Sequence, residues 1–419
     1  MDTTQPTPEK TFASMGINPK ILEILTTKGI LIPTPIQAGG IPSALEGKDM
    51  IGIAQTGTGK TYAFGIPMLQ RIAEKGGRGL VLVPTRELAQ QVEESLRPMA
   101  NALGIGIAVF IGGASMHLQR MSLKRNPKIL IATPGRLIDH LEQRTVTLKE
   151  VAVLVLDEAD RMLDMGFAPQ LKKIMVTVPA ERQTMLFSAT MPHEITKIAS
   201  THMRIPIRIE VAPQGTTATN VEQVMLIIHK EDKFTILLKL LEDYTGTILV
   251  FSRTKHGAKK LTKMLNSTGY SAAEIHSNRS LAQRREALTG FKTGRYRILI
   301  ATDIAARGID VNNIELVVNY DLPDNPDEYV HRIGRTGRAG KKGQAISLAT
   351  PEQRGDIRTI ERLIRSKLDV TEVPRSGKGP HPAEKAHHAE MPDRPRFSGG
   401  GRSFGGRSSG GSRGGYRRR

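Results

Sequence analysis

The amino-acid sequence predicts an α/β fold with two tandem domains, each built on a doubly wound parallel sheet, and a disordered basic C-terminal tail. The chain has 419 residues, whereas a single hydrophobic core stops growing near about 250–300 residues, so two domains are expected. Short apolar runs alternate with longer amphipathic stretches on both sides of one break in the pattern. Such alternation is typical of parallel strands joined by crossover helices.

The first domain is expected over residues 1–210. Apolar runs of strand length, rich in β-branched residues, predict buried parallel strands at 49–54, 79–84, 107–113, 128–134, 151–158 and 184–190. Amphipathic patterns between these runs predict helices, for example over 60–76 and 85–103. The region therefore has the pattern of one doubly wound α/β domain.

A linker and a second domain are expected next. Pro, Gly and a cluster of Thr interrupt the alternation and predict an interdomain linker over 211–221. The pattern then resumes over 222–371, with no visible sequence repeat between the halves. Strands are expected at 224–229, 247–252, 297–303, 315–320 and 344–350, and helices at 232–244, 254–267 and 351–367.

The C-terminal segment 372–419 is rich in Pro, His, Gly, Ser and Arg. Residues 375–419 contain eleven Lys or Arg against three Asp or Glu, a net charge of +8 out of the chain's +19. With almost no aliphatic side chains this segment is expected to be disordered. The overall charge favours a nucleic acid as partner. An anionic membrane is the weaker alternative, because no basic amphipathic anchor stands out.

The cellular environment is also constrained by composition. The chain has no cysteine, which excludes disulfides and thiolate metal sites. Its N-terminus is polar, and nowhere do about 18 apolar residues run together. We therefore expect a soluble cytoplasmic protein without membrane contact.

The stretch GIAQTGTGKTYAF has the context of a phosphate-binding loop between a strand and a helix. The strict pattern G-x-x-x-x-G-K-[ST] has glycine where this chain has Ala54. Gly57 and Gly59 allow the backbone to curl with its N–H groups inward, beside a helix N-terminus. Lys60 would reach the β and γ phosphates of a nucleotide, and Thr61 would bind Mg²⁺. The alternative is a tight glycine turn with a chance Lys-Thr pair.

Two acidic residues end the strand expected at 151–158. Asp157 suits Mg²⁺ coordination, and Glu158 suits the general base that activates water. Acidic residues after strands also serve as helix caps, so this pair alone leaves both interpretations open. Together with the phosphate loop, the pair favours ATP hydrolysis.

Residues 157–160 spell Asp-Glu-Ala-Asp, and the chain resembles the DEAD-box ATP-dependent RNA helicases of superfamily 2. In that family the phosphate loop reads A-x-T-G-x-G-K-T, which matches this chain from Ala54 on. Motifs in family order cover about residues 12–345. The resemblance implies two RecA-like domains, RNA-dependent ATPase activity of the EC 3.6.4.13 type, ATP and Mg²⁺ as cofactors, and RNA as partner. It also indicates a bacterial protein of an RhlE-like subgroup.

The resemblance assigns roles to individual residues, with Phe12 stacking on the adenine, Gln37 reading its edge and Asp303 contacting the ribose. The nucleotide-binding residues it implies are Phe12, Gln37, Thr56, Gly57, Thr58, Gly59, Lys60, Thr61, Asp303, Arg335 and Arg338. The implied catalytic residues are Lys60, Asp157, Glu158, Arg335 and Arg338, and the implied metal ligands are Thr61 and Asp157. The implied RNA contacts are Pro84, Thr85, Arg86, Gly113, Thr133, Pro134, Gly135, Arg136, Arg253 and Thr302. Coupling of hydrolysis to strand opening falls to Ser188, Thr190, Asp310 and His331.

Three basic residues near the end of the second domain recur at spacings of four and three. A helical segment would carry His331, Arg335 and Arg338 on one side. A solvated basic face is the alternative, but the resemblance implies that the two arginines act as fingers on the γ phosphate. One position departs from the family pattern: Leu281 stands where Q-x-x-R often has its glutamine, although Arg284 is retained.

The resemblance implies that the core grips RNA through its backbone, with little sequence preference, and opens short duplexes by bending one strand. The tail resembles an RGG-type RNA-binding segment, with arginines for phosphates and with Phe397, Phe404 and Tyr416 for base stacking. A solubilising linker is the alternative for the tail. Its irregularly spaced histidines, His381, His387 and His388, are expected to be solvated rather than metal ligands.

Two other classes of function are alternatives to an RNA helicase. The first is a non-catalytic RNA chaperone or scaffold, which has no need to keep Lys60, Glu158 and the two arginines together. The second is a DNA helicase of related architecture, against which the Gln37 motif and the Asp-Glu-Ala-Asp spelling argue. Proteins of ribonucleoprotein complexes, ribosome assembly or RNA decay are the partner classes that the resemblance suggests.

Overall fold

The structure is a computed structural model that describes residues 11–54, 57–211, 221–306, 311, 314–337 and 342–374. Two seven-stranded sheets organise these residues, one in the first half of the chain and one in the second. Every strand pair within the described ranges is parallel. The strands of each sheet therefore end at one common edge.

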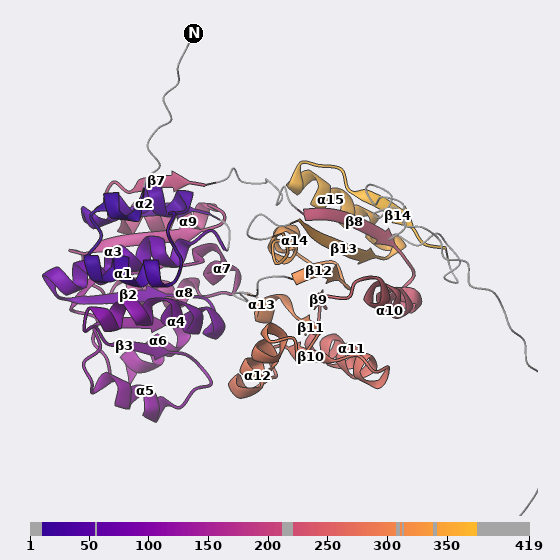
Figure 1. Cartoon of the computed structure of the whole chain (residues 1–419), viewed down its shortest axis with the longest axis horizontal. Helices are drawn as coiled ribbons and strands as arrows, with labels where there is room; N and C mark the ends of the chain where they lie inside the picture. The colour runs from indigo at the N-terminus through magenta and orange to yellow at the C-terminus, as the bar shows by residue number, and fades with distance from the viewer. Residues whose placement is uncertain are drawn as a thin grey trace, which may run out of the picture. The chain divides into compact units, whose positions relative to one another are not determined.

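The first sheet has the order β3-β4-β2-β5-β6-β1-β7. Figure 1 labels its strands β2, β3 and β7 among the helices of this half of the chain. In register, Met50 pairs with Met185 on one side and with Ile207 on the other. Its strands are β1 (Met50–Ile53), β2 (Arg78–Leu82), β3 (Ile107–Phe110), β4 (Ile129–Ala132), β5 (Val151–Leu156), β6 (Gln183–Ser188) and β7 (Ile207–Glu210).

Two apolar cores flank this sheet because successive strand residues point to opposite faces. Met50 packs in one core with Phe64 and Leu96, whereas its neighbour Ile51 packs in the other with Met162. The helices are η1 (Phe12–Met15), α1 (Pro19–Thr27), α2 (Pro35–Leu45), α3 (Lys60–Lys75), α4 (Arg86–Ala102), α5 (Met116–Leu123), α6 (Pro134–Glu142), α7 (Ala159–Asp164), α8 (Ala168–Met175) and α9 (His193–His202).

The second sheet repeats this plan with the order β10-β11-β9-β12-β13-β8-β14. Its strands are β8 (Val221–Ile227), β9 (Thr247–Phe251), β10 (Ala272–Ile275), β11 (Ile298–Ala301), β12 (Ile314–Asn319), β13 (Gly343–Ala349) and β14 (Asp369–Glu372). The helices are η2 (Lys230–Asp232), α10 (Lys233–Asp243), α11 (Lys255–Ser267), α12 (Leu281–Lys292), α13 (Asp303–Ala306), α14 (Pro326–Ile333), η3 (Pro351–Gln353) and α15 (Arg354–Ile364). Leu249 and Ile248 again belong to two different cores.

The predicted fold class is confirmed, and the differences lie at the sheet edges and at element ends. Strands β7, β10 and β14 were not predicted, and β8 begins at Val221, the last residue of the expected linker. The helix expected to carry His331, Arg335 and Arg338 ends at Ile333, so this prediction was wrong: turn residues follow from Gly334 to Gly337. Among the residues that the structure describes, none of the helices has the length and apolar character needed to cross a bilayer.

Candidate functional site

The residues predicted to act in the first half of the chain follow the carboxyl ends of its strands. The phosphate loop follows β1, 84–86 follow β2, 112–113 follow β3, 133–136 follow β4 and 157–158 follow β5, while 188–190 end β6. Because the sheet is parallel, all six segments lie along the same edge. This is the edge at which doubly wound sheets bind ligands.

The phosphate loop has the backbone geometry that its glycines permit. Gly57 and Gly59 have φ angles of +88° and +90°, which L side chains rarely adopt. Lys60 begins α3 and is buried, and its Nζ donates a hydrogen bond of 2.9 Å to the carbonyl oxygen of Ala54. The lysine is thus held inside its own loop, while Thr61 follows it in the first turn of α3.

Gln37 joins the start of α2 to this loop. Its Oε1 accepts a hydrogen bond of 2.9 Å from the backbone N–H of Thr34, and its Nε2 donates one of 3.0 Å to the carbonyl oxygen of Gly59. Glycine is favoured at position 59 by its φ of +90°, and a Cβ there would also overlap this amide unless the glutamine side chain shifted. Phe12 is only 4% exposed and packs in the first core. The contacts of both side chains with adenine stay predictions.

Asp157 and Glu158 are both buried but have opposite pKa shifts. Burial raises the pKa of Asp157 to about 6, although the positive charge of Lys60 opposes the shift. Burial also opposes ionisation of Glu158, but the charges of Arg161, Lys60 and Arg335 outweigh it, and the net pKa of Glu158 lies below its usual value. Glu158 is therefore held as the anion, which is the form that accepts a proton.

The backbone of Glu158 is strained. Its φ of +52° lies in the left-handed region, which is uncommon for a residue with a side chain. This conformation precedes the first residue of α7, and Arg161 on that helix donates from Nη1 to Glu158 Oε2 at 3.1 Å. The arginine is 2% exposed, so this ion pair is screened little by solvent.

Asp160 connects the acidic motif to the segment after β6. Its Oδ2 accepts hydrogen bonds from the backbone N–H groups of Ala189 at 3.0 Å and Thr190 at 2.8 Å, and from Thr190 Oγ1 at 3.0 Å. Its own backbone N–H donates to Ser188 Oγ at 3.2 Å. If either segment moved, several of these hydrogen bonds between Asp160 and residues 188–190 would break.

The predicted RNA contacts of the first half hold their loops in place. Arg86 lies against Gly113, where a φ of +77° and the absence of Cβ leave room for its guanidinium group. Thr85 caps α4, since its Oγ1 accepts from the N–H of Leu88 at 3.2 Å. Arg136 donates from Nη1 to the carbonyl oxygen of Ala114 at 3.0 Å. Around it on the first turn of α6 lie the other predicted contacts, Thr133, Pro134 and Gly135, while Pro84 is buried after β2.

The second half places its predicted residues after β9 and β11. Arg253 follows β9 with its side chain 44% exposed, and its Nε forms an ion pair with Asp324 Oδ1 at 3.3 Å. Thr302 and Asp303 follow β11, where Asp303 is bound by both Nε and Nη2 of Arg332, at 2.5 and 2.8 Å. His331 and Arg335 lie with Arg161 around one small hollow.

Three predicted site residues, Thr56, Asp310 and Arg338, lie outside the described residues. So do most of the linker, at 212–220, and the tail from 375 on, including His381, His387, His388, Phe397, Phe404 and Tyr416. Their roles stay predictions.

Comparison with known proteins identifies the family. A sequence model described as DEAD/DEAH box helicase matches residues 34–198, and one described as helicase conserved C-terminal domain matches residues 232–340. The ATP-dependent RNA helicase CshA of Listeria monocytogenes is 43% identical over 366 residues, which span 87% of this chain and 70% of that protein. The chain belongs to the DEAD-box RNA helicase family.

Other members of the helicase family give the same result. The ATP-dependent rRNA helicase RRP3 of Meyerozyma guilliermondii is 42% identical over 362 residues, or 85% of this chain and 76% of that protein. The solved structure of S. cerevisiae Dbp5 bound to RNA and ADP BeF3 is 30% identical, covers 87% of this chain and 96% of its own, and has a TM-score of 0.77. Mss116 bound to ssRNA and UDP-BeF is 26% identical, covers 89% and 82%, and has a TM-score of 0.81. The predicted family and its tandem RecA-like fold are confirmed, while the RhlE-like subgroup stays a prediction.

Several helicase residues in the site were not assigned a role from the sequence. Asp160, Arg161 and Arg332 are buried and bind predicted site residues directly. Asp160 and Arg161 lie within or beside the motif, so their position was a usable signal. Arg332 had none beyond its place one residue after His331.

The departure at Leu281 also has a structural counterpart in the helicase. Leu281 begins α12, follows the N-cap Ser280 and packs at the border of the first core. The retained Arg284 forms an ion pair with Glu87 on α4, with 2.9 Å between Nε and Oε1. The apolar contact at Leu281 and the ion pair at Arg284 therefore both join α12 to the first half of the chain.

Proposed function

We propose that the protein is an RNA-dependent ATPase that uses ATP to open short RNA duplexes locally or to remodel RNA–protein complexes. The observation that carries the proposal is the buried cluster after β1 and β5. There Lys60, Asp157 and Glu158 lie within one another's electrostatic influence, and Arg335 also acts on Glu158. A buried cation, two carboxylates and a further arginine are the groups that phosphoryl transfer to water requires.

In this mechanism the side chains of the cluster divide the work. Lys60 leaves the Ala54 carbonyl and neutralises charge on the β and γ phosphates. Glu158, kept ionised by its cationic neighbours, accepts a proton from the attacking water. Arg335 and Arg338 offset the charge that develops on the γ phosphate. The remaining nucleotide contacts that we propose are Phe12, Gln37, Thr56, Gly57, Thr58, Gly59, Thr61 and Asp303.

Mg²⁺ is the metal that we propose for this site. No group of three or more His, Cys, Asp or Glu able to hold a metal ion occurs in the described ranges. Mg²⁺ suits that situation, because it takes one or two protein oxygens and completes its shell with phosphate and water. Asp157, a 2% exposed carboxylate, and Thr61 would hold it. When bound, the ion supplies positive charge to the phosphate oxygens.

RNA binding and coupling are proposed for the segments along the same sheet edge. The contacts are mainly to the RNA backbone, since the side chains concerned are arginines and small residues that allow close main-chain approach. The proposed RNA contacts are Pro84, Thr85, Arg86, Gly113, Thr133, Pro134, Gly135, Arg136, Arg253 and Thr302. For Ser188 and Thr190, the hydrogen bonds to Asp160 support a coupling role. Asp310 and His331 complete the proposed coupling group.

The proposed organisation is an ATP-binding domain over 1–210, a linker over 211–221, a second helicase domain over 222–371 and an RNA-binding tail over 372–419. We further propose a cytoplasmic location, an RhlE-like subgroup, and partners among proteins of ribosome assembly or RNA decay. The chain's +19 charge and lack of cysteine support the location and the RNA partner.

ATP hydrolysis with and without single-stranded RNA tests the proposal. We expect RNA to stimulate hydrolysis strongly, and Lys60→Ala and Glu158→Gln each to abolish it. Lys75→Ala at the exposed end of α3 and Glu94→Gln on the surface of α4 are the matched controls, and both should retain activity.

Each alternative function has its own outcome. Stimulation by single-stranded DNA but not by RNA would identify a DNA helicase. RNA binding and strand annealing with no hydrolysis in the wild type would identify a chaperone. Full activity of both site variants would refute the assignment of the cluster.

A further inference from the structure

Helix α15 carries a row of arginines opposite its buried face. Ile357, Ile360 and Ile364 are buried in the second core. Arg354, Arg358 and Arg362 are exposed, and their spacing of four residues places them within about 80° of one another around the helix axis, while Arg365 is exposed at the C-cap with a φ of +53°. The three helical arginines therefore form a charged stripe on the surface of the second half of the chain, and Arg365 lies just past its C-terminal end.

The carboxylates near the stripe are already engaged. Arg354 pairs with Glu372 on β14, and Lys367 Nζ pairs with Glu361 Oε2 at 3.2 Å. Glu361 Oε1 also accepts the backbone N–H of Leu368 at 3.2 Å.

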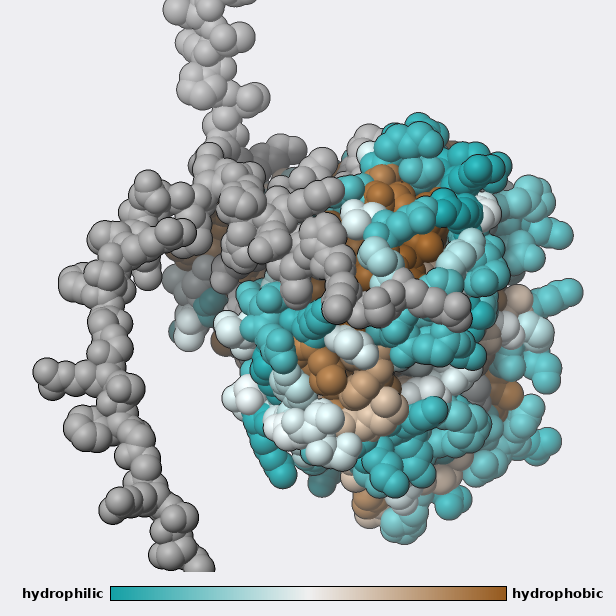
Figure 2. Space-filling view, turned by 90° about the vertical axis from the view of Figure 1, so that its right-hand side faces the viewer, coloured by the Kyte–Doolittle hydropathy of each residue, from teal (hydrophilic) through white to brown (hydrophobic). Residues whose placement is uncertain are grey.

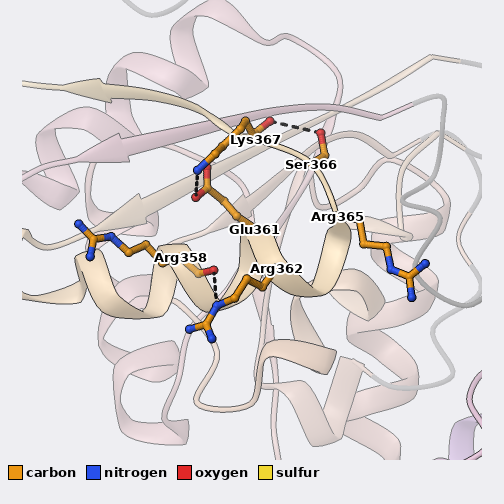
Figure 3. Close-up of a pocket in the computed structure, with 6 residues that line it drawn as sticks. All are labelled: Arg358, Glu361, Arg362, Arg365, Ser366 and Lys367. Atoms are coloured by element: carbon orange, nitrogen blue, oxygen red, sulfur yellow. Dashed lines mark hydrogen bonds and ion pairs between the residues drawn. The ribbon is translucent and has the colours of Figure 1, made fainter.

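Three arginines here form no ion pair with a carboxylate within the described part of the chain, although the pKa of Glu361 is lowered by the N–H of Leu368 and also by the charges of Lys367 and Arg358. We name Arg358, Arg362 and Arg365 the α15 arginine row. The guanidinium of Arg362 donates at 3.4 Å from Nε to the carbonyl oxygen of Arg358 and at 3.3 Å from Nη2 to Thr359 Oγ1. Figure 3 shows the three guanidinium groups extending from the helix, whereas Lys367 turns back to Glu361. The row thus keeps donors and charge available for a ligand.

A shallow hollow of about 500 Å³ lies among these side chains, with Ser366 and Lys367 completing its wall. The face of the molecule in Figure 2 is mainly hydrophilic where it is coloured, with brown apolar areas near its middle. Each guanidinium offers planar donors that match phosphate oxygens. An anion, and a phosphate in particular, is the ligand that the hollow fits.

The surroundings of α15 favour RNA as the source of that phosphate. A neighbouring groove of about 910 Å³ is lined by Arg253, a proposed RNA contact, and by Gln353 and Asp356 at the start of α15. After residue 374 the sequence continues into a segment with eleven Lys or Arg against three Asp or Glu. A membrane surface is disfavoured, because the isoleucines of α15 are buried and cannot insert between lipids.

We propose that the α15 arginine row binds the phosphate backbone of RNA at a position separate from the contacts at the sheet edge. The inference rests on the proposed function, since it assigns a second contact surface for the same RNA. Its effect should be greatest for an RNA long enough to reach from the groove at Arg253 to α15. A short single strand that fills only the sheet-edge contacts should bind almost independently of the row.

The test uses the full chain and the double variant Arg358→Gln/Arg362→Gln, which keeps good helix formers at exposed positions. The matched control is Lys259→Gln/Lys263→Gln on α11, which removes the same charge from two exposed residues at the same spacing. Binding is measured for a short single-stranded RNA and for a longer RNA with a duplex arm, across salt concentrations. ATP hydrolysis at saturating RNA is measured in the same preparations.

We expect the arginine variant to lose affinity for the longer RNA by about tenfold or more at about 0.1 M salt, and its salt slope to fall by about 1.8, or 0.9 for each duplex phosphate contact. The short RNA, the control variant and hydrolysis at saturating RNA should change little. Equal affinities of the arginine and control variants for the longer RNA would refute the inference. The inference would also be refuted if the arginine variant kept its affinity for the longer RNA but, in a parallel measurement, lost binding to anionic vesicles or to an acidic protein. Failure of RNA to stimulate the wild type would instead refute the proposed function.

Discussion

Replacing Asp157 by asparagine should stabilise the nucleotide-free protein while abolishing its activity. The native carboxyl is buried, and its pKa is raised from 3.8 to about 6. The folded state therefore holds a proton up to about pH 6, whereas the unfolded chain releases it near 3.8. Above pH 6 the native state must carry an unfavourable buried charge, so ionised Asp157 lowers the free energy of unfolding.

The size of this effect follows from the pKa shift. At about 1.4 kcal/mol for each pKa unit, the shift to about 6 corresponds to roughly 3 kcal/mol at pH 8. Asparagine keeps an acceptor for the backbone N–H of Glu158, but its side-chain N–H groups are buried in place of a carboxyl oxygen and need acceptors of their own. We therefore expect Asp157→Asn to gain about 1–2 kcal/mol at pH 8. The penalty on the ionised carboxyl falls to about 1.6 kcal/mol at pH 5 and to about 0.5 kcal/mol at pH 4, so the gain should be nearly lost at pH 5 and replaced by a loss of about 1 kcal/mol near pH 4.

Denaturant unfolding between pH 4 and pH 8, without nucleotide and with a chelator present, measures this gain. Glu158→Gln is the matched comparison, because the adjacent carboxyl has a lowered pKa and pairs with Arg161. Removing its charge leaves a buried arginine unpaired and should destabilise the protein by about 3 kcal/mol. The reasoning fails if Asp157→Asn is destabilising at pH 8, if its effect does not vary with pH, or if both variants shift stability in the same direction.

Three further predictions concern coupling, the phosphate loop and the tail. Asp160→Asn should reduce the amount of duplex opened per ATP hydrolysed more than it reduces the rate of ATP hydrolysis. A double-mutant cycle with Thr190→Val should give a coupling energy of about 1 kcal/mol. Equal losses of unwinding and hydrolysis would contradict this prediction. Gly59→Ala should weaken nucleotide binding about tenfold, because alanine is strained at this positive φ and its Cβ would overlap the side-chain amide of Gln37. Gly76→Ala is the control, since Gly76 also has a positive φ but no atom lies where its Cβ would be. Equal nucleotide affinity of the two variants would contradict this prediction. Deleting 375–419 should weaken RNA binding and its salt dependence but leave basal hydrolysis largely intact, and unchanged RNA affinity would argue against the tail.

The strands that the sequence predicted are those with continuous apolar side chains. Buried parallel strands such as β5 and β11 need apolar residues on both faces, and this requirement is visible in one sequence. The strands that were missed lack it: β10 reads Ala-Ala-Glu-Ile, β7 alternates with charged residues, and β14 is largely polar. All three lie at sheet edges, where one side is not covered by another strand.

The part of the site that could be predicted from the sequence is the set of residues that come directly after the predicted strands. Once β1 and β5 are placed, the phosphate loop and the acidic motif must meet at one edge of the sheet. What the sequence could not indicate is which neighbouring charges are buried. Arg332 shows the difficulty, since an exposed arginine and one that is 1% exposed read alike in the sequence. Its partner Asp303 was predicted, but the two residues are 29 positions apart in the sequence, and only the fold brings them together.

The hydrogen bond from Lys60 to the Ala54 carbonyl means that nucleotide binding is an exchange of partners. The ammonium group is already bound by a backbone oxygen, and an incoming phosphate has to compete with that oxygen for it. That competition selects for ligands that bind at several points, because a lone phosphate ion gains little from displacing one hydrogen bond. Position 54 acts here through its main chain, so an alanine there performs the task as well as a glycine. The backbone N–H of Ala54 also donates to the carbonyl oxygen of Ser188 at 3.0 Å. The residue whose carbonyl releases Lys60 is therefore hydrogen-bonded to the segment that binds Asp160.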